Sequence, residues 1–243
     1  MNLEIQAISG VPEITPGANL GEILQQALLE SGMDTLPTDI VAVTQKIVSK
    51  AEGRIVQLSQ IDPSPDAHAI GRQCSKDPRL VEVILQESRR ILRIRGEVII
   101  CETHHGFICA NAGVDRSNID GGDAVSLLPR DPDRSARQLA HRLGCGIIVT
   151  DTFGRPWRDG LLDLAIGIAR VPPLLDYRGQ LDPQGYPLQA TALAAVDALA
   201  AAAGLAMGKV SKTPAARIRG YAWTETASNI QTLLRPYAKD LFL

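Results

Sequence analysis

Apolar and polar residues alternate along the chain with the periods of both helices and strands. Residues 20–31 carry apolar side chains at helical spacing, follow Asn19 and stop at Gly32, which predicts a helix with an amino-terminal cap. Residues 40–44 and 54–58 look like strands on either side of a polar segment. The pattern predicts a fold that mixes α and β elements.

Three further segments have the start and stop signals of helices. An Asp-Pro pair at residues 77–78 predicts a helix to about residue 94, with apolar positions along one side. A second Asp-Pro pair, at residues 131–132, predicts a shorter helix. Residues 188–207 are rich in alanine and end at Gly208, which predicts a helix packed tightly against a sheet or another helix.

Residues 98–111 have the pattern of a β-hairpin. A turn centred on His105 sets Cys101 opposite Cys109. Two cysteines with two histidines between them could suggest zinc, but structural zinc sites normally pair closely spaced ligands on each of two knuckles. The pattern therefore favours two small buried side chains on facing strands.

The most informative chemistry follows the strand-forming residues 147–150. They run directly into Asp151 and Thr152, and then into a loop that contains two arginines. A strand that ends in a carboxylate and a hydroxyl beside a basic loop is a common way to hold a divalent cation next to a phosphate. The alternative is an Asx-turn that closes the strand, with Trp157 filling the core.

A second extended run ends in a carboxylate at Asp115. If the fold joins the two strand ends, their hard oxygen ligands suit Mg²⁺ or Mn²⁺ beside a phosphate. The chain has neither a Walker motif nor a dinucleotide-binding glycine fingerprint, so a nucleotide site here is of an unusual type. The basic side chains available to bind anions are Lys46, Lys50, Arg116, Arg155 and Arg158.

Composition narrows the class of protein. The chain has 243 residues, a net charge of -2 and 45% hydrophobic residues, enough for a full core and too little basic excess for a sequence-independent nucleic-acid binder. No apolar run approaches the length of a membrane span, and the start lacks the features of a signal peptide. We therefore expect a soluble, cytoplasmic protein that binds neither nucleic acid nor membrane.

Four blocks of unusual composition carry a family resemblance that runs from residue 9 to about residue 220. They are residues 43–54, 105–118, 150–160 and 176–179. With these blocks the chain resembles the coenzyme F-420-0:L-glutamate ligase family, the γ-glutamyl ligases of deazaflavin cofactor biosynthesis. The resemblance implies an α+β (mixed α/β) fold in which residues 1–243 form one catalytic domain of two intimately joined subdomains. It also implies an intertwined homodimer.

The activity implied by the resemblance is a GTP-dependent, metal-dependent addition of L-glutamate to coenzyme F-420-0, followed by a second glutamate in γ-linkage. The implied metal ligands are Asp115, Asp151 and Thr152, for Mg²⁺ or Mn²⁺ and two ions in number, and a need for K⁺ stays open. Lys209 departs from the family pattern, which has an acidic or amide residue there in many members. The implied nucleotide contacts are Val11, Pro12, Glu13, Ile14, Gln45, Lys50, Asn118, Met207, Gly208, Lys209, Val210, Ser211, Lys212, Thr213 and Pro214.

An amide ligase must first activate a poor electrophile, the carboxylate. We expect the γ-phosphate of GTP to move onto the acceptor carboxylate, and the glutamate amine to attack the resulting acyl phosphate. Lys50 would act as a point charge on the phosphates, and Arg155 or Arg158 would hold the acceptor or the glutamate. Two alternatives stay open: a ligase of the same fold with a different carboxylate acceptor, and an inactive nucleotide-binding paralogue.

Overall fold

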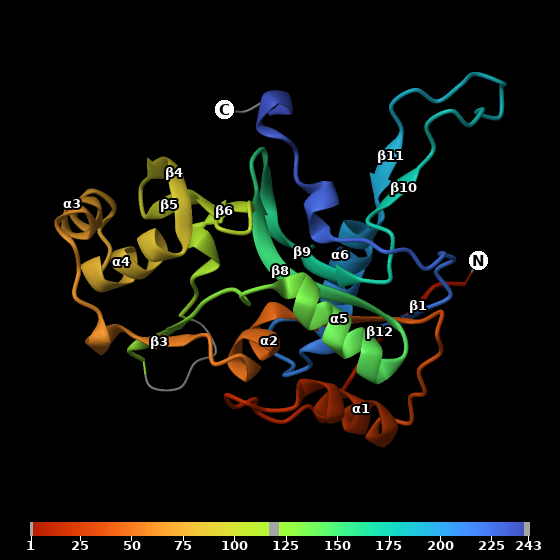
Figure 1. Ribbon diagram of the computed structural model, residues 1–243, viewed down its shortest axis with the longest axis horizontal. Coiled ribbons are helices and arrows are strands. Elements are labelled where there is room, and N and C mark those ends of the chain that lie inside the picture. Colours follow the sequence, from red (N-terminus) through yellow and green to blue (C-terminus); the bar gives the residue numbers. More distant parts are fainter. Residues whose placement is uncertain (1, 117–121, 241–243) are drawn as a thin grey trace.

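A five-stranded mixed sheet lies at the centre of the computed structural model, in which residues 2–116 and 122–240 are described (Figure 1). The inner strands β2 (Ile40–Thr44) and β8 (Gly146–Arg155) are parallel, and Thr44 pairs with Thr150. Residues 40–43 of β2 and 147–149 of β8 are fully buried, as expected for strands covered on both faces. The order is β1 (Glu4–Ala7), β12 (Ala215–Arg219), β2, β8 and β9 (Arg158–Ala169), and every pair except β2–β8 is antiparallel.

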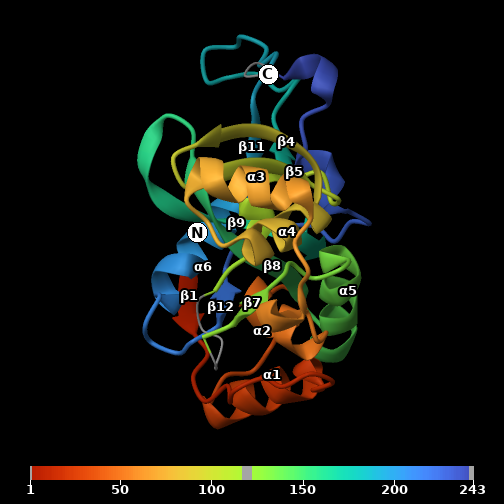
Figure 2. The same cartoon turned by 90° about the vertical axis from the view of Figure 1, so that its left-hand side faces the viewer.

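Helices cover both faces of this sheet. Helix α6 (Ala195–Met207) lies on one side and α5 (Pro132–Leu143) on the other, with α1 (Leu20–Glu30) packed against α5 (Figure 2). Gly167 lies on the sheet where α5 begins. A Cβ atom there would lie 2.5 Å from Pro132, so a residue with a side chain does not fit. None of the described helices has the length and apolarity that crossing a membrane requires.

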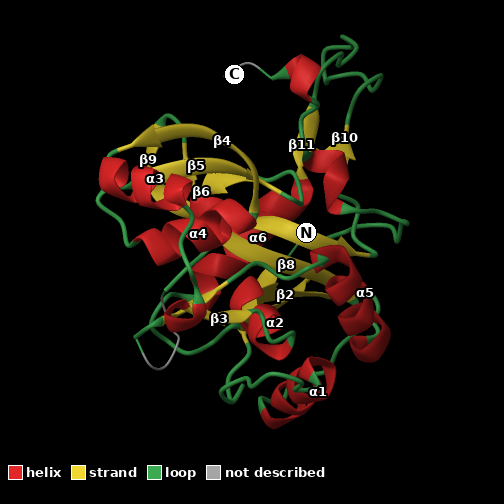
Figure 3. Ribbon diagram, turned by 60° about the vertical axis from the view of Figure 1, so that its left-hand side comes forward, coloured by secondary structure: helices red, strands yellow, loops and turns green. Residues whose placement is uncertain are grey.

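A second apolar core lies beside the sheet, in the part of the chain between β2 and α5. Helices α3 (Pro65–Cys74) and α4 (Pro78–Gln86) pack there on a three-stranded sheet (Figure 3). The strands of that sheet are β4 (Ser88–Arg95), β5 (Val98–Thr103) and β6 (Ile108–Ala110). This arrangement confirms the predicted α+β class.

Short elements connect and extend these two parts. Helix α2 (Gln45–Ala51) follows β2, while β3 (Ile55–Gln57) pairs with β7 (Ala124–Ser126). Strands β10 (Leu174–Asp176) and β11 (Ala192–Ala194) form an arm that projects from the molecule (Figure 1). The single-turn helices are η1 (Leu58–Gln60), η2 (Asn111–Gly113), η3 (Ile230–Leu233) and η4 (Tyr237–Lys239).

Several sequence predictions are confirmed. Asn19 caps α1 by accepting a hydrogen bond from the Glu22 amide, and the predicted helix after residue 131 is α5. Strands β2 and β3 lie where strands were expected, although the polar segment between them forms α2. In the predicted hairpin, Cys101 pairs with Cys109.

Two predicted helices are wrong in part. Helix α4 ends at Gln86, and residues 88–95 form a strand, because Ile91 and Ile94 pack on the second core while neighbouring arginines ion-pair with Glu102 on β5. The alanine-rich helix begins only at Ala195, because residues 192–194 pair with β10.

Both predicted strand ends also need correction. Strand β8 does not end at Asp151 but continues to Arg155, because residues 152–155 pair with β9 in a tight hairpin. Trp157, at the tip of that hairpin, is 77% exposed, so it does not fill the core. Asp115 lies beyond β6 and η2 and bridges to Ser126.

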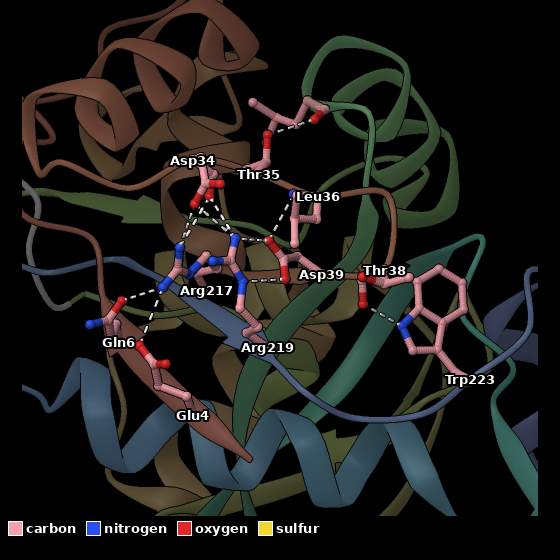
Figure 4. Close-up of polar contacts among 11 residues, drawn as sticks. Glu4, Gln6, Asp34, Thr35, Leu36, Thr38, Asp39, Arg217, Arg219 and Trp223 are labelled. Carbon is pink, nitrogen blue, oxygen red and sulfur yellow. Dashed lines mark hydrogen bonds and ion pairs between the residues drawn. The ribbon is translucent and has the colours of Figure 1, made fainter. Parts of the chain in front are cut away.

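An ion-pair network fixes the sheet at the end of β2 remote from Thr44 (Figure 4). Arg219 of β12 donates from Nε and a terminal nitrogen to both oxygens of Asp39, at 2.9 and 2.7 Å. Asp39 is fully buried and also accepts the Leu36 amide at 2.8 Å. Arg217 is nearly buried and binds Gln6 and Glu4 on β1, so the network joins three neighbouring segments.

Candidate functional site

A cavity of about 750 Å³ opens where the parallel strands β2 and β8 run toward α2 and the β8–β9 hairpin. Such an edge of a sheet is a common place for ligands. Its walls come from four segments far apart in the sequence. They are Val11, Pro12, Glu13, Ile14, Thr44, Gln45, Lys46, Ile47, Lys50, Thr150, Asp151, Thr152, Asp163, Gly208, Lys209, Val210, Lys212, Thr213 and Pro214.

The wall formed by α2 carries two lysines, each paired with a carboxylate. Lys46 Nζ lies 2.7 Å from Asp115 Oδ2, and Lys50 Nζ pairs with Glu13 Oε1. Gln45 is buried at the start of the helix, where its Oε1 accepts a hydrogen bond from Ser49 Oγ at 2.8 Å. These contacts hold two ammonium groups at the cavity.

The wall formed by the β8–β9 hairpin carries Asp151, Thr152 and Asp163. Thr152 lies directly opposite Asp163, and its Oγ1 donates to Asp163 Oδ1 at 2.5 Å. Burial raises the pKa of the Asp151 carboxyl to about 7, and the nearby carboxylates of Asp115 and Asp163 act in the same direction. The ammonium of Lys46 opposes this shift but does not cancel it. Asp151 is therefore poised to accept a further cation.

The third wall is the loop between α6 and β12. Gly208 ends α6 with a φ of 64°, a conformation that favours glycine and turns the chain toward the cavity. The hydroxyls of Ser211 and Thr213 both donate to Met207 O, which ties the loop back to the helix. Lys209 Nζ lies 2.7 Å from Asp163 Oδ1 and 2.8 Å from Thr152 Oγ1.

Most of the predicted nucleotide contacts meet in this one cavity. Met207 and Ser211 are outside its lining, since Met207 is buried and Ser211 braces the loop. Asn118 lies outside the described residues. The predicted contacts that line the cavity are Val11, Pro12, Glu13, Ile14, Gln45, Lys50, Gly208, Lys209, Val210, Lys212, Thr213 and Pro214.

The two predicted catalytic arginines lie apart from the cavity lining, at the turn of the β8–β9 hairpin. Arg155 donates to the backbone oxygens of Asp159 and Gly160, so its guanidinium braces its own turn. The backbone of Arg158 lies opposite that of Arg155 in the register of the hairpin. Of the three residues expected to act in catalysis, only Lys50 lines the cavity.

The predicted metal ligands come close together but do not form a closed cage. Asp115 is near enough to raise the pKa of Asp151, and Thr152 follows Asp151 in β8. Within residues 2–116 and 122–240, no three His, Cys, Asp or Glu side chains are grouped to hold a metal. These residues fit an ion such as Mg²⁺, which completes its shell with water and substrate phosphates.

Asp163 is a site residue that the sequence reasoning missed. It is a single carboxylate in the otherwise apolar segment 161–168 of β9, and its side chain is only 5% exposed. A lone acid in a buried strand needs a partner, which was the available signal. The partner could not be foreseen, because Lys209 comes from a loop 46 residues away.

The hairpin with two cysteines and two histidines has a different organisation from a zinc knuckle. The ring nitrogen Nε2 of His104 contacts Gln86 O at 2.8 Å, and that of His105 contacts Pro129 O at 2.9 Å. Cys101 and Cys109 are buried, and burial raises the pKa of both thiols. Cys101 packs in the second core, and the two histidine rings contact backbone oxygens of neighbouring segments.

Comparison with known proteins identifies the family. The family model of F420-0:Gamma-glutamyl ligase matches residues 10–220. A coenzyme F420:L-glutamate ligase of Methanothermobacter thermautotrophicus is 43% identical, with 100% of this chain and 99% of that protein covered. The enzymes of the same name from Methanopyrus kandleri and Methanocaldococcus jannaschii are 41% and 34% identical, covering 99% and 100% of this chain and 97% and 95% of their own lengths. The chain belongs to the F420-0:gamma-glutamyl ligase family.

Proposed function

We propose that this protein adds L-glutamate to coenzyme F-420-0 at the expense of GTP, releasing GDP and phosphate, and then adds a second glutamate in γ-linkage. The names of its relatives indicate the two substrates, L-glutamate and the F420 coenzyme. The observation that supports a nucleotide is the cavity itself, whose described lining carries four lysines, two on α2 and two on the loop between α6 and β12. Several fixed positive charges around one cavity suit a triphosphate.

The first step would transfer a phosphoryl group. A carboxylate oxygen of the acceptor attacks the γ-phosphorus of GTP, the bond to the β-phosphate oxygen breaks, and GDP leaves. The side chain of Glu13 is 69% exposed and can turn to solvent. The ammonium of Lys50 would then leave its ion pair with Glu13 and bind phosphate oxygens. Mg²⁺ or Mn²⁺ held by Asp115, Asp151 and Thr152 would supply charge neutralisation on the phosphates when bound.

The second step would form the amide. The amine of glutamate attacks the carbonyl carbon of the acyl phosphate, the bond from that carbon to the phosphate oxygen breaks, and phosphate leaves while the amine loses a proton. The lysines that neutralise GDP also neutralise the departing phosphate. Arg155 and Arg158 remain proposed contacts of the acceptor or the glutamate, which would have to extend from the cavity to the turn of the β8–β9 hairpin.

The test replaces Asp151 by Asn and measures glutamylated products by chromatography and mass spectrometry after incubation with F-420-0, GTP, glutamate and Mn²⁺. We expect a loss on the order of 100-fold or more, because the amide cannot neutralise a cation. Asp62→Asn is the matched control, since Asp62 is exposed and outside the cavity lining. Near-normal activity of Asp151→Asn would contradict the metal assignment.

The identity of the acceptor is tested separately. Mass spectrometry of wild-type reactions with other carboxylate acceptors distinguishes a deazaflavin ligase from a ligase of the same fold with another substrate. Glutamylation of a different acceptor in preference to F-420-0 would overturn the substrate assignment. Calorimetry that detects no GTP binding in the presence of Mn²⁺ would overturn the GTP assignment.

A further inference from the structure

The ammonium of Lys209 occupies a defined place in the cavity. It lies 2.7 Å from Asp163 Oδ1 and 2.8 Å from Thr152 Oγ1, while Thr152 itself donates to the same carboxylate oxygen. We propose that this ammonium is a built-in cation that takes the place of a second divalent ion. This inference rests on the proposed function and narrows its metal ligands: with nucleotide bound, the protein would hold one divalent ion on Asp115 and Asp151, and Thr152 would stay with Lys209 instead of binding a second ion.

The fold leaves Asp163 only one oxygen for a cation. A Cβ atom on Gly204 would lie 2.2 Å from Asp163 Oδ2, so that oxygen faces the backbone of α6 at close range. The other oxygen, Oδ1, faces Lys209. Because the carboxylate is almost fully buried, it needs a charged or hydrogen-bonding partner at this oxygen.

A divalent ion could not share this position with the lysine. Mg²⁺ binds oxygen ligands at about 2.1 Å, so an ion on Asp163 Oδ1 and Thr152 Oγ1 would overlap the ammonium that already contacts both. A protonated lysine has no lone pair and cannot become a ligand of that ion. The residues present therefore do not fit a second divalent ion at this position.

The conformation of the loop, rather than burial of the side chain, determines the position of Lys209. Its side chain is 59% exposed, and the loop that carries it begins at the positive-φ residue Gly208. Thr213 ties the same loop to Met207 O at 2.6 Å. The loop backbone thus places Lys209 opposite Asp163.

The number of bound Mn²⁺ ions tests the proposal without any assay of activity. Chelator-treated protein is saturated with GDP and titrated with Mn²⁺, and free Mn²⁺ is followed by electron paramagnetic resonance. We expect one ion per wild-type chain and two for Lys209→Gln, whose amide oxygen can join Thr152 and Asp163 as a ligand. Lys239→Gln makes the same charge change at an exposed position away from the cavity and should bind one ion.

Two results would overturn the proposal. Two Mn²⁺ ions per wild-type chain would show that the ammonium does not exclude a second ion, and this measurement does not depend on any variant folding. A single ion in a folded Lys209→Gln, verified by thermal unfolding, would show that Lys209 is not what limits the number. Wild-type protein that binds GDP but no Mn²⁺ would overturn the metal role in the proposed function, and this inference with it.

Discussion

At the scale of single residues, Asp151 differs from the other carboxylates of the site, because no ion pair among the described residues reaches it. Lys46 pairs with Asp115 and Lys209 with Asp163. Asp151 is also the carboxyl group whose pKa burial raises to about 7. Asp151 is thus the carboxylate at the cavity whose negative charge is not balanced by an ion pair among the described residues.

The raised pKa of Asp151 predicts how stability depends on pH. Between its unfolded value of 3.8 and about 7 the folded state binds the extra proton, so this group's contribution to stability falls as pH rises and stays at its minimum above 7. Asp151→Asn removes the penalty. We expect it to stabilise chelator-treated protein by on the order of 2 kcal/mol at pH 8, and by much less at pH 5.

Chemical denaturation of wild type and variant at both pH values measures this difference. Asp62→Asn is again the control, because an exposed carboxyl should give the same small change at either pH. Equal stabilisation by Asp151→Asn at pH 5 and pH 8 would contradict the assigned titration.

Gly204 is the second residue with a specific structural demand. Alanine there would place Cβ at 2.2 Å from Asp163 Oδ2, so Asp163 or α6 must shift. We expect Gly204→Ala to lower the free energy of unfolding by about 1–3 kcal/mol, despite the better helix propensity of alanine. Leu205→Ala, on the same helix but 89% exposed, should change it by less than about 0.5 kcal/mol. A Gly204→Ala variant as stable as wild type would show that the close approach is unimportant.

At the scale of elements, the sequence predicted well where the capped helices begin and how the hairpin pairs. The caps of α1 and α5 and the alternation in the β5–β6 hairpin all gave correct elements. It failed where tertiary pairing decided, as in β4, whose arginines are paired by Glu102 from a neighbouring strand. Strand β8 likewise continues past Asp151 only because β9 returns to pair with it.

The ion-pair network around Arg219 offers an element-scale test of what holds β12 to the start of β2. Asp39 and Asp34 both bind Arg219, but Asp39 is fully buried and Asp34 is 69% exposed. We expect Asp39→Ala to lower the free energy of unfolding by about 3 kcal/mol, because it leaves Arg219 and the Leu36 amide without their buried acceptor. Asp34→Ala should cost clearly less, since water replaces its exposed oxygens. Similar losses in the two variants, measured by urea denaturation, would contradict this ranking.

At the scale of the whole molecule, two apolar cores lie side by side. The larger core contains the five-stranded sheet and its covering helices, and the smaller one is built from α3, α4 and the β4–β6 sheet. The cavity belongs to the larger core, and Asp115, outside the cavity lining, contacts Lys46 of its wall. Residue types alone led to the expectation of phosphate chemistry, but the meeting of four distant segments at the cavity depends on this packing.

Ile99→Ala tests whether the two cores open separately. Ile99 is fully buried in the smaller core, and its truncation should cost about 2–4 kcal/mol there. In native-state hydrogen exchange we expect faster exchange of amides in α4 and β5, with those of β2 and β8 little changed. Ile148→Ala, the matching change in the larger core, should instead accelerate β2 and β8. Uniform acceleration of all amides by Ile99→Ala would indicate a single cooperative unit.

The four cysteines of the chain are all buried thiols, and three of them belong to one or the other core. Cys74 and Cys101 belong to the smaller core and Cys145 to the larger, with a pKa of about 12 for Cys145. Alkylating reagents attack the thiolate of an accessible cysteine, so these buried thiols stay unlabelled until the protein around them unfolds locally. The order in which the native thiols become labelled therefore reports which of the two cores opens first.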